Sequence, residues 1–272
     1  EKQDMSEVDS AIQLGYSCYN IIKNNYLKEN LIGVFIYGSH GNKIKNNFLT
    51  FNKKRGLYLQ ISASNHISKN IIKSNNGTGI YLWMSNENKL QNNQINFNYG
   101  SGIIFVGSKN NIISRNFIRF NNKKGVYIKS NERDTHPSLP WILSYNNTIK
   151  KNTISKNQHG IYVDNADSNL IYNNNIIDNK IQAIDNGHNN RWYDSNSKGG
   201  NYWSDWIGPD DDGIIERNKE IKGDAESIDK YPYAERDGWE EDVPSGYLFV
   251  LLVLITLVAV VFTWWRRIKI DQ

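Results

Sequence analysis

A glycine that returns every 23 residues is the feature that most constrains this 272-residue chain. The repeat positions are Gly33, Gly56, Gly79, Gly102, Gly125 and Gly160, with Ser10 and Ala183 expected at the same place in the first and last copies. The one irregular spacing, between Gly125 and Gly160, marks an insertion loop at residues 130–146. A fixed period of this length indicates about eight stacked copies of one structural unit, a solenoid.

The residues that follow each glycine alternate in character. The first column is Val34, Leu57, Ile80, Ile103, Val126, Ile161 and Ile184, and the third is Ile36, Leu59, Leu82, Phe105, Ile128 and Val163. Apolar side chains at every second position are typical of a strand with one buried face. We therefore expect both columns to point into the core.

The second half of each copy follows the pattern N-x-I-x-x-N-x-I-x-x-N, as in Asn65, Ile67, Asn70, Ile72 and Asn75. This five-residue step does not fit a helix and suits short strands joined by tight bends. Asn tolerates left-handed backbone conformations and bonds to nearby main chain. We predict that the Asn residues form the bends and stack into amide ladders along the solenoid axis.

This repeat, with its Gly79-Ile80-Tyr81-Leu82 strand, resembles the NosD-like parallel β-helix repeats of the carbohydrate-binding/sugar-hydrolase superfamily. The segment Gly200–Trp206, GNYWSDW, is similar to the one that closes archaeal NosD-like surface proteins, and Asp229-Lys230-Tyr231-Pro232 continues that pattern. The resemblance covers residues 10–233. It implies an all-β, right-handed parallel β-helix followed by a small cap region.

The charges divide the chain. Residues 1–185 carry 22 basic and 12 acidic side chains, whereas residues 186–242 carry 7 basic and 15 acidic ones. We predict β-helix repeats over 1–185 and an acidic, Trp/Tyr-rich C-terminal cap region over 186–242. The total net charge of +4 is too small and too dispersed for a dedicated nucleic-acid binder, so no nucleic-acid partner is expected.

Residues 246–265 form 20 consecutive positions without a charge, enough for a helix across a hydrocarbon core of about 30 Å. Acidic residues precede this stretch, and Arg266, Arg267 and Lys269 follow it. The positive-inside rule then predicts a single-pass membrane protein with an extracellular N-terminal domain and a cytoplasmic basic tail, 266–272. The sequence gives no oligomeric state.

Aromatic side chains fill the outward positions of the predicted strands. The candidate ligand-binding residues are Tyr58, Tyr81, Trp83, Tyr127 and Tyr162. A stripe of aromatic rings can stack on sugar rings, but such ladders also stabilise sheets without any ligand. We predict a non-catalytic, cell-surface module that binds carbohydrate or envelope polymers.

Two alternatives stay open. A polysaccharide-active enzyme would use acids near Asp164 and the loop 130–146, although carboxylates do not stack on neighbouring copies as glycoside hydrolysis requires. A passive surface scaffold or protein-binding spacer would need neither the aromatic stripe nor the acids.

Two metals, calcium and copper, bear on this sequence. Asp210, Asp212 and Glu216 lie beside Gly213 and are candidate calcium ligands, although the spacing is not that of an EF-hand loop. The NosD name points to assembly of a copper enzyme. The five histidines and the single cysteine, Cys18, show no ligand spacing, so copper-enzyme maturation is not expected.

Overall fold

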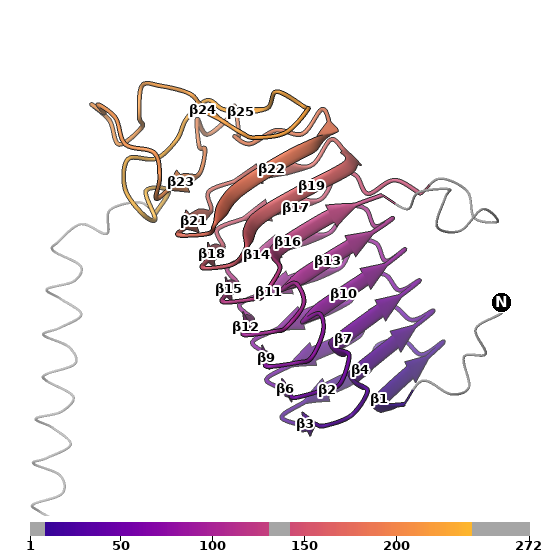
Figure 1. Cartoon of the computed structure of the whole chain (residues 1–272). Helices are drawn as coiled ribbons and strands as arrows, with labels where there is room; N and C mark the ends of the chain where they lie inside the picture. The colour runs from indigo at the N-terminus through magenta and orange to yellow at the C-terminus, as the bar shows by residue number, and fades with distance from the viewer. Residues whose placement is uncertain (1–8, 131–141, 241–272) are drawn as a thin grey trace, which may run out of the picture. The chain divides into compact units, whose positions relative to one another are not determined.

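In the computed structural model, which describes residues 9–130 and 142–240, the chain winds into a right-handed parallel β-solenoid of about eight coils (Figure 1). Successive coils contribute strands to three parallel sheets of eight, seven and eight strands, and this stacking is the one that the 23-residue repeat predicts. Residues 246–265, the tail 266–272 and most of the insertion loop lie outside the described residues. No helix in the described ranges is long and apolar enough to cross a membrane.

The three sheets run along the solenoid axis. Sheet A holds β1 (Ser10–Gly15), β4 (Ile32–Tyr37), β7 (Arg55–Gln60), β10 (Ile80–Trp83), β13 (Ile103–Val106), β16 (Lys124–Lys129), β19 (His159–Asp167) and β22 (Ile181–His188). Sheet B holds β2 (Ile21–Lys23), β5 (Lys43–Lys45), β8 (His66–Ser68), β11 (Lys89–Gln91), β14 (Ile112–Ser114), β17 (Thr148–Lys150) and β20 (Leu170–Tyr172). Sheet C holds β3 (Tyr26–Lys28), β6 (Phe48–Thr50), β9 (Ile71–Lys73), β12 (Gln94–Asn96), β15 (Phe117–Arg119), β18 (Thr153–Ser155), β21 (Asn175–Ile177) and β23 (Tyr202–Trp203). A short antiparallel pair, β24 (Lys219–Glu220) and β25 (Ile228–Asp229), lies in the C-terminal segment.

The predicted inward columns form the core. From Val34 to Ile161 and from Ile36 to Val163, every member is fully buried and lies in one continuous apolar cluster. Each coil stacks the same kind of side chain on the preceding coil. The burial of each Ile, Leu or Val contributes about 2 kcal/mol to the free energy of unfolding. The hydrophobic column therefore runs through the whole repeat region.

The register at the two ends differs from the prediction by one residue. Ile161 pairs with Ala183 and Tyr162 with Ile184, so Ala183 is the inward residue and Ile184 lies on the outer face. At the other end Ser10 pairs with Ile32 rather than standing opposite Gly33. The terminal coils of sheet A are one residue shorter than the central ones, which a constant 23-residue spacing does not anticipate.

The predicted amide ladders are present. Asn93 is fully buried, and its Oδ1 accepts hydrogen bonds from the backbone N and the Nδ2 of Asn70, both at 3.0 Å. Its own Nδ2 donates to Asn116 Oδ1 at 3.0 Å and to the Ile67 carbonyl at 2.9 Å. The same pattern recurs along three ladders, which begin at Asn20, Asn25 and Asn30.

The left-handed bends, however, do not lie at the ladder Asn residues. The positive φ angles belong to the residues just before them, for example Lys69 (55°), Asn92 (56°) and Arg115 (55°). The prediction that the repeating Asn supplies this conformation is therefore wrong. The Asn side chain points inward and holds its neighbours, while an outward residue of almost any type takes the bend.

The repeat glycines are required by close approach between coils. A Cβ on Gly79 would lie 2.7 Å from the Gly102 carbonyl oxygen and 2.7 Å from Ile95 Cγ2. We expect Gly79→Ala to lower the free energy of unfolding by about 2 kcal/mol because backbone would have to move. Gly15→Ala is the matched control, since its Cβ meets nothing within 4 Å. Urea denaturation of both variants checks this, and equal effects would contradict it.

Candidate functional site

The outer face of sheet A carries all five predicted ligand-binding residues. Tyr58 pairs with Tyr81, and Tyr127 pairs with Tyr162, in one column along the axis. Trp83 lies at the end of β10, in the neighbouring outward column. All five side chains are half-buried rather than openly exposed. The structure thus brings these residues to one face, but as two groups separated by the coil of β13.

The first group is built around Arg55, the first residue of β7. Its guanidinium carbon lies 4.6 Å from the ring centroid of Tyr58 and 4.3 Å from that of Tyr81, a cation–π arrangement. Burial raises the pKa of Tyr58 to about 12, although the Arg55 charge opposes the shift. Both phenols therefore stay neutral, and their ring faces are partly covered by a fixed positive charge.

The second group is built around Lys124, the first residue of β16. Its Nζ lies 4.1 Å from the ring centroid of Tyr127 and 4.8 Å from that of Tyr162. Tyr127 donates a hydrogen bond of 2.7 Å to Asp164 Oδ2. The Nδ2 of Asn186 donates to the Tyr162 hydroxyl at 3.1 Å. These bonds hold both rings in place against the lysine.

His159, the first residue of β19, pairs with Lys124 on the neighbouring strand and contacts the Tyr162 ring edge-on at 5.8 Å. Burial, and then the charges of Lys124 and Lys180, lower the pKa of His159. Burial also lowers the pKa of Lys124, an effect that Asp164 opposes. Burial raises the pKa of Tyr162. The group thus combines a cation, a neutral imidazole at neutral pH and a protonated phenol.

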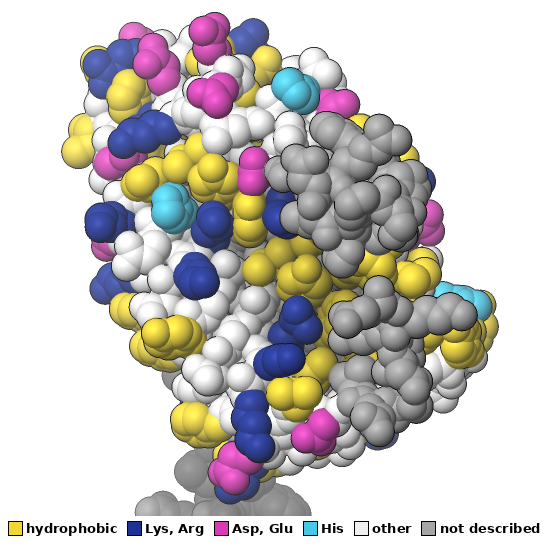
Figure 2. All heavy atoms as spheres, turned by 45° about the vertical axis from the view of Figure 1, so that its right-hand side comes forward, with side chains coloured by type: hydrophobic (Ala, Val, Ile, Leu, Met, Phe, Trp, Pro, Cys, Tyr) yellow, Lys and Arg dark blue, Asp and Glu magenta, His cyan; other side chains and the backbone are white. Residues whose placement is uncertain are grey.

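Sequence reasoning missed the basic residues of this face. Arg55, Lys124 and His159 each stand one residue before a repeat glycine, but Thr78 and Ser101 occupy the same column, so the sequence shows no repeating basic position there. Asp164, proposed for the enzymatic alternative, does lie in the second group. On the side of the molecule seen in Figure 2, Lys and Arg side chains lie among hydrophobic ones. This face can therefore attract anionic groups and also contact the sugar rings of a ligand.

A family model described as "Periplasmic copper-binding protein (NosD)" matches residues 1–142 and 141–208. The chain belongs to the NosD family. A comparison with curated protein sequences found no match. Membership of the NosD family agrees with the β-solenoid and with the closing segment described above, and it leaves the chemistry to be argued from the residues.

Solved structures similar to this NosD-family chain share its fold. A double mutant of the periplasmic alginate epimerase AlgG is 21% identical, with a TM-score of 0.55, and the match covers 61% of this chain and 38% of that one. The enzymatically active domain of tailspike protein 2 of bacteriophage CBA120 is 11% identical, with a TM-score of 0.50, over 76% of this chain and 32% of that one. The chain therefore spans well under half the length of either.

The residues of this NosD-family chain do not fit a copper site. Among the described residues, no three His, Cys, Asp or Glu side chains gather in a way that could hold a metal ion. The nearest soft pair is Cys18 Sγ and His40 Nδ1, 3.0 Å apart, which supplies two ligands only.

The calcium prediction likewise receives no support from the geometry. Asp210 Oδ1 accepts from the backbone N of Gly213 at 3.3 Å, and Asp212 Oδ1 accepts from that of Ile214 at 3.1 Å. These carboxylates therefore close a turn, and Glu216 does not join them in a metal-binding group of the described chain.

The segment Gly200–Trp206 extends the ladder and forms hydrogen bonds to a buried acid. Asn201 accepts from Asn174 Nδ2 at 2.9 Å, which continues the second ladder. Asp229 Oδ2 accepts from Trp203 Nε1 at 2.9 Å and from the backbone N of Asn201 at 2.7 Å. A second buried acid, Asp185, accepts from Trp192 Nε1 at 2.8 Å. The Asp185 side chain is fully buried.

The burial of Asp229 makes the stability of the protein depend on pH. It raises the pKa of this carboxyl to about 7, above the ordinary value of 3.8, while the bonds from Trp203 and Asn201 oppose the shift. A raised carboxyl pKa means that this group's contribution to stability is present at low pH and is lost as pH rises from about 4 to 7. The cost at pH 7 is on the order of a few kcal/mol.

We expect Asp229→Asn to destabilise the protein, because the new amide faces N–H donors. We also expect the wild type to lose stability relative to this variant as pH rises from 4 to 7. Urea denaturation at several pH values measures the difference. A difference that stays constant, or that changes with the opposite sign, would contradict a raised pKa.

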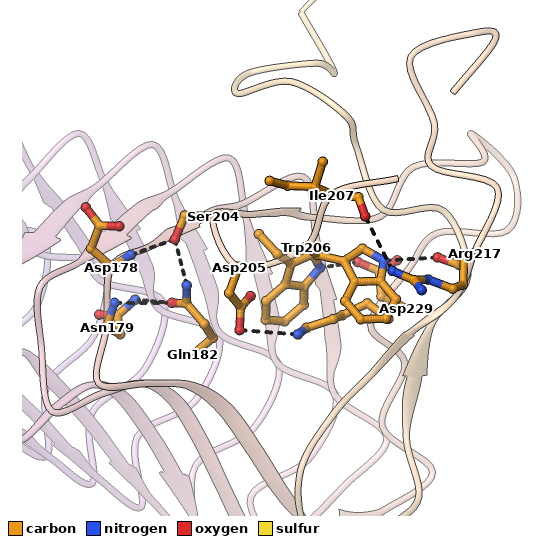
Figure 3. A network of polar contacts seen from close by, with 11 residues as sticks. Asp178, Asn179, Gln182, Ser204, Asp205, Trp206, Ile207, Arg217 and Asp229 are labelled. Carbon is orange, nitrogen blue, oxygen red and sulfur yellow. Dashed lines mark hydrogen bonds and ion pairs between the residues drawn. The ribbon is translucent and has the colours of Figure 1, made fainter. Parts of the chain in front are cut away.

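A polar pocket of about 340 Å³ lies beside this segment, between β22 and β24. Figure 3 shows that its side chains bond to one another: the Ser204 Oγ accepts from the Asp178 backbone N and from Gln182 Nε2, each at 2.8 Å. Asp205 pairs with Lys219 at 3.3 Å. Since these groups already satisfy each other, sheet A is the better candidate site.

Proposed function

We propose that this chain binds an anionic polysaccharide along the outer face of sheet A, without changing it chemically. The observation that carries the proposal is the pair of cation–tyrosine clusters, Arg55 with Tyr58 and Tyr81, and Lys124 with Tyr127 and Tyr162. Sugar rings pack against aromatic side chains, and fixed cations pair with carboxylate or sulfate groups. The two clusters together supply both kinds of contact.

The spacing of the clusters favours a polymer over a small molecule. Arg55 and Lys124 are three coils apart, which corresponds to about 14 Å along the axis. A chain of several sugar units lying along the sheet would meet both cations. The excess of basic residues in 1–185 adds a favourable long-range field for a negatively charged chain.

The structural neighbours are consistent with a carbohydrate ligand through their fold alone. One is named as an alginate epimerase and another as a tailspike domain, and both share this β-solenoid fold. Their identities of 21% and 11% carry only the fold, so the ligand class is argued from Arg55, Lys124 and the tyrosines of this chain.

The experiment is a retention assay with the full chain in a polyoxyethylene detergent. Immobilised polyuronate, sulfated glycan and neutral glucan are compared, and reducing and unsaturated ends are measured in the same samples. Retention on the anionic polymers without new ends is the expected result. Retention on none of them would favour the passive scaffold or spacer.

A polysaccharide-active enzyme is the second candidate, because Lys124, His159, Tyr162 and Asp164 gather in one group. A neutral imidazole can take a proton beside a uronate carboxylate that the lysine neutralises, and a protonated phenol can return one. New unsaturated ends that disappear in His159→Asn would establish this candidate and overturn the non-catalytic one.

We further propose the placement of the site in the cell. Residues 186–242 would cap the solenoid, residues 246–265 would anchor it in a membrane, and the tail 266–272 would be cytoplasmic, which leaves sheet A on the extracellular side. This rests on the apolar 20-residue stretch and its one-sided basic flank. Protease protection of the tail in sealed vesicles tests it.

A further inference from the structure

A second aromatic surface lies at the bend that follows sheet C, away from the stripe on sheet A. Phe51, Phe97 and Phe120 each occupy the left-handed position just before an Asn of the third ladder, with φ of 55° to 56°. They are 57%, 56% and 39% exposed. The rings of Phe97 and Phe120 stack with 4.9 Å between centroids and 3° between planes. Exposed apolar side chains that lie next to one another, unlike single ones, often mark a binding surface.

The column has one gap. The register of β6, β9 and β12 places Ser74 between Phe51 and Phe97, so a small hydroxyl stands between two coils that each carry a ring; the outer coils of the column carry Glu29, Lys156 and Asp178 instead. Neighbouring coils are about 4.8 Å apart, and the positions of Phe51 and Phe97 are therefore about 9.6 Å apart. That distance leaves room for one ring stacked at the spacing that Phe97 and Phe120 already show.

The gap opens into a shallow groove of about 360 Å³. Beside Ser74 and the stacked pair, its lining includes Asn76, Tyr99 and Asn122. Tyr99 is 63% exposed, and both Asn residues are exposed. The lining thus offers aromatic faces, two amides and two hydroxyls, and every one of its residues is uncharged.

We propose that this groove binds a neutral sugar, with one pyranose ring seated over Ser74 against the free face of Phe97. The amides of Asn76 and Asn122 can both donate to and accept from hydroxyls, which a sugar requires and an apolar partner does not. The uncharged lining distinguishes the groove from the cationic face of sheet A. This site is separate from the one in the proposed function and stands or falls independently of it.

The test places a ring at position 74, where the column of phenylalanines is interrupted. In Ser74→Phe the new ring takes the place of the sugar, and the fold should persist because Phe already occupies the same left-handed position in neighbouring coils. Ser64→Phe is the matched control, since Ser64 is exposed and left-handed (φ 54°) at a different bend. Titration calorimetry and saturation-transfer NMR with cello-, manno- and galacto-oligosaccharides give the affinities for the full chain.

We expect millimolar binding of at least one oligosaccharide, weakened about tenfold or more in Ser74→Phe and in Phe97→Ala and unchanged in Ser64→Phe. Absence of binding by all three oligosaccharides would overturn the proposal. So would equal or tighter binding in Ser74→Phe, because an added ring would then act as part of an open platform. Loss of neutral-sugar binding on substitution of Arg55 and Lys124 would place the sugar on sheet A and also overturn it.

Discussion

Replacement of Asn93 by alanine is expected to lower the free energy of unfolding by about 3 to 5 kcal/mol. The fully buried side chain makes four hydrogen bonds, to the backbone N and Nδ2 of Asn70, to Asn116 Oδ1 and to the Ile67 carbonyl. Alanine would leave these groups without partners in an interior that water does not reach. The loss therefore includes their desolvation, which exceeds the net value of each bond.

The control for this variant is Asn218→Ala, because Asn218 is exposed in the C-terminal segment and lies outside the ladders. Urea denaturation followed by circular dichroism gives both stabilities, and hydrogen exchange reports which coils open. We expect the exchange of the coils on either side of Asn93 to increase most, since each coil contacts only its neighbours. A loss below about 1 kcal/mol for Asn93→Ala would show that the ladder does not hold the solenoid together.

The second large effect concerns binding. The double variant Arg55→Gln/Lys124→Gln is expected to weaken the affinity for a soluble polyuronate by about a hundredfold, roughly tenfold for each charge-assisted contact. Glutamine keeps a similar length and polarity, so the tyrosines lose only the positive charge over their rings. The control Lys73→Gln/Lys89→Gln removes the same charge from exposed positions on sheets C and B.

Calorimetric affinities of five proteins separate the two clusters: the wild type, each single variant, the double variant and the control. If the polymer spans both, each single variant should lose affinity. A loss confined to Lys124→Gln would restrict the ligand to the coils of β16 and β19, and equal losses in the double variant and its control would reduce the interaction to net charge.

Much of the fold could be predicted because the same pattern of apolar and Asn positions recurs in almost every copy of the repeat. The columns of Val34 and Ile36 and the ladders through Asn93 recur in nearly every copy, so a strand and its buried face were evident without any structure. The register of Ser10 and Ala183 could not be predicted, because the terminal coils are one residue shorter than the others. Only the pairing with the neighbouring strand shows where each coil is shortened.

The candidate site was predicted in part. The tyrosines were found from one column, but their ring faces meet Arg55 and Lys124, which come from another column and reach across the strand. Such contacts depend on side-chain direction, which spacing alone does not give. Phe51, Phe97 and Phe120 were also visible as residues before an Asn, yet the gap at Ser74 has meaning only once the coils are stacked.

The most direct test of the central claim is the salt dependence of polyuronate binding by the full chain, measured by calorimetry for the wild type, Arg55→Gln/Lys124→Gln and Lys73→Gln/Lys89→Gln. We predict that wild type and control bind with the same affinity and the same loss of affinity as salt increases. The Arg55/Lys124 variant should bind far more weakly and depend less on salt. Wild-type affinity in that variant, or no polyuronate binding by the wild type at low salt, would contradict the account.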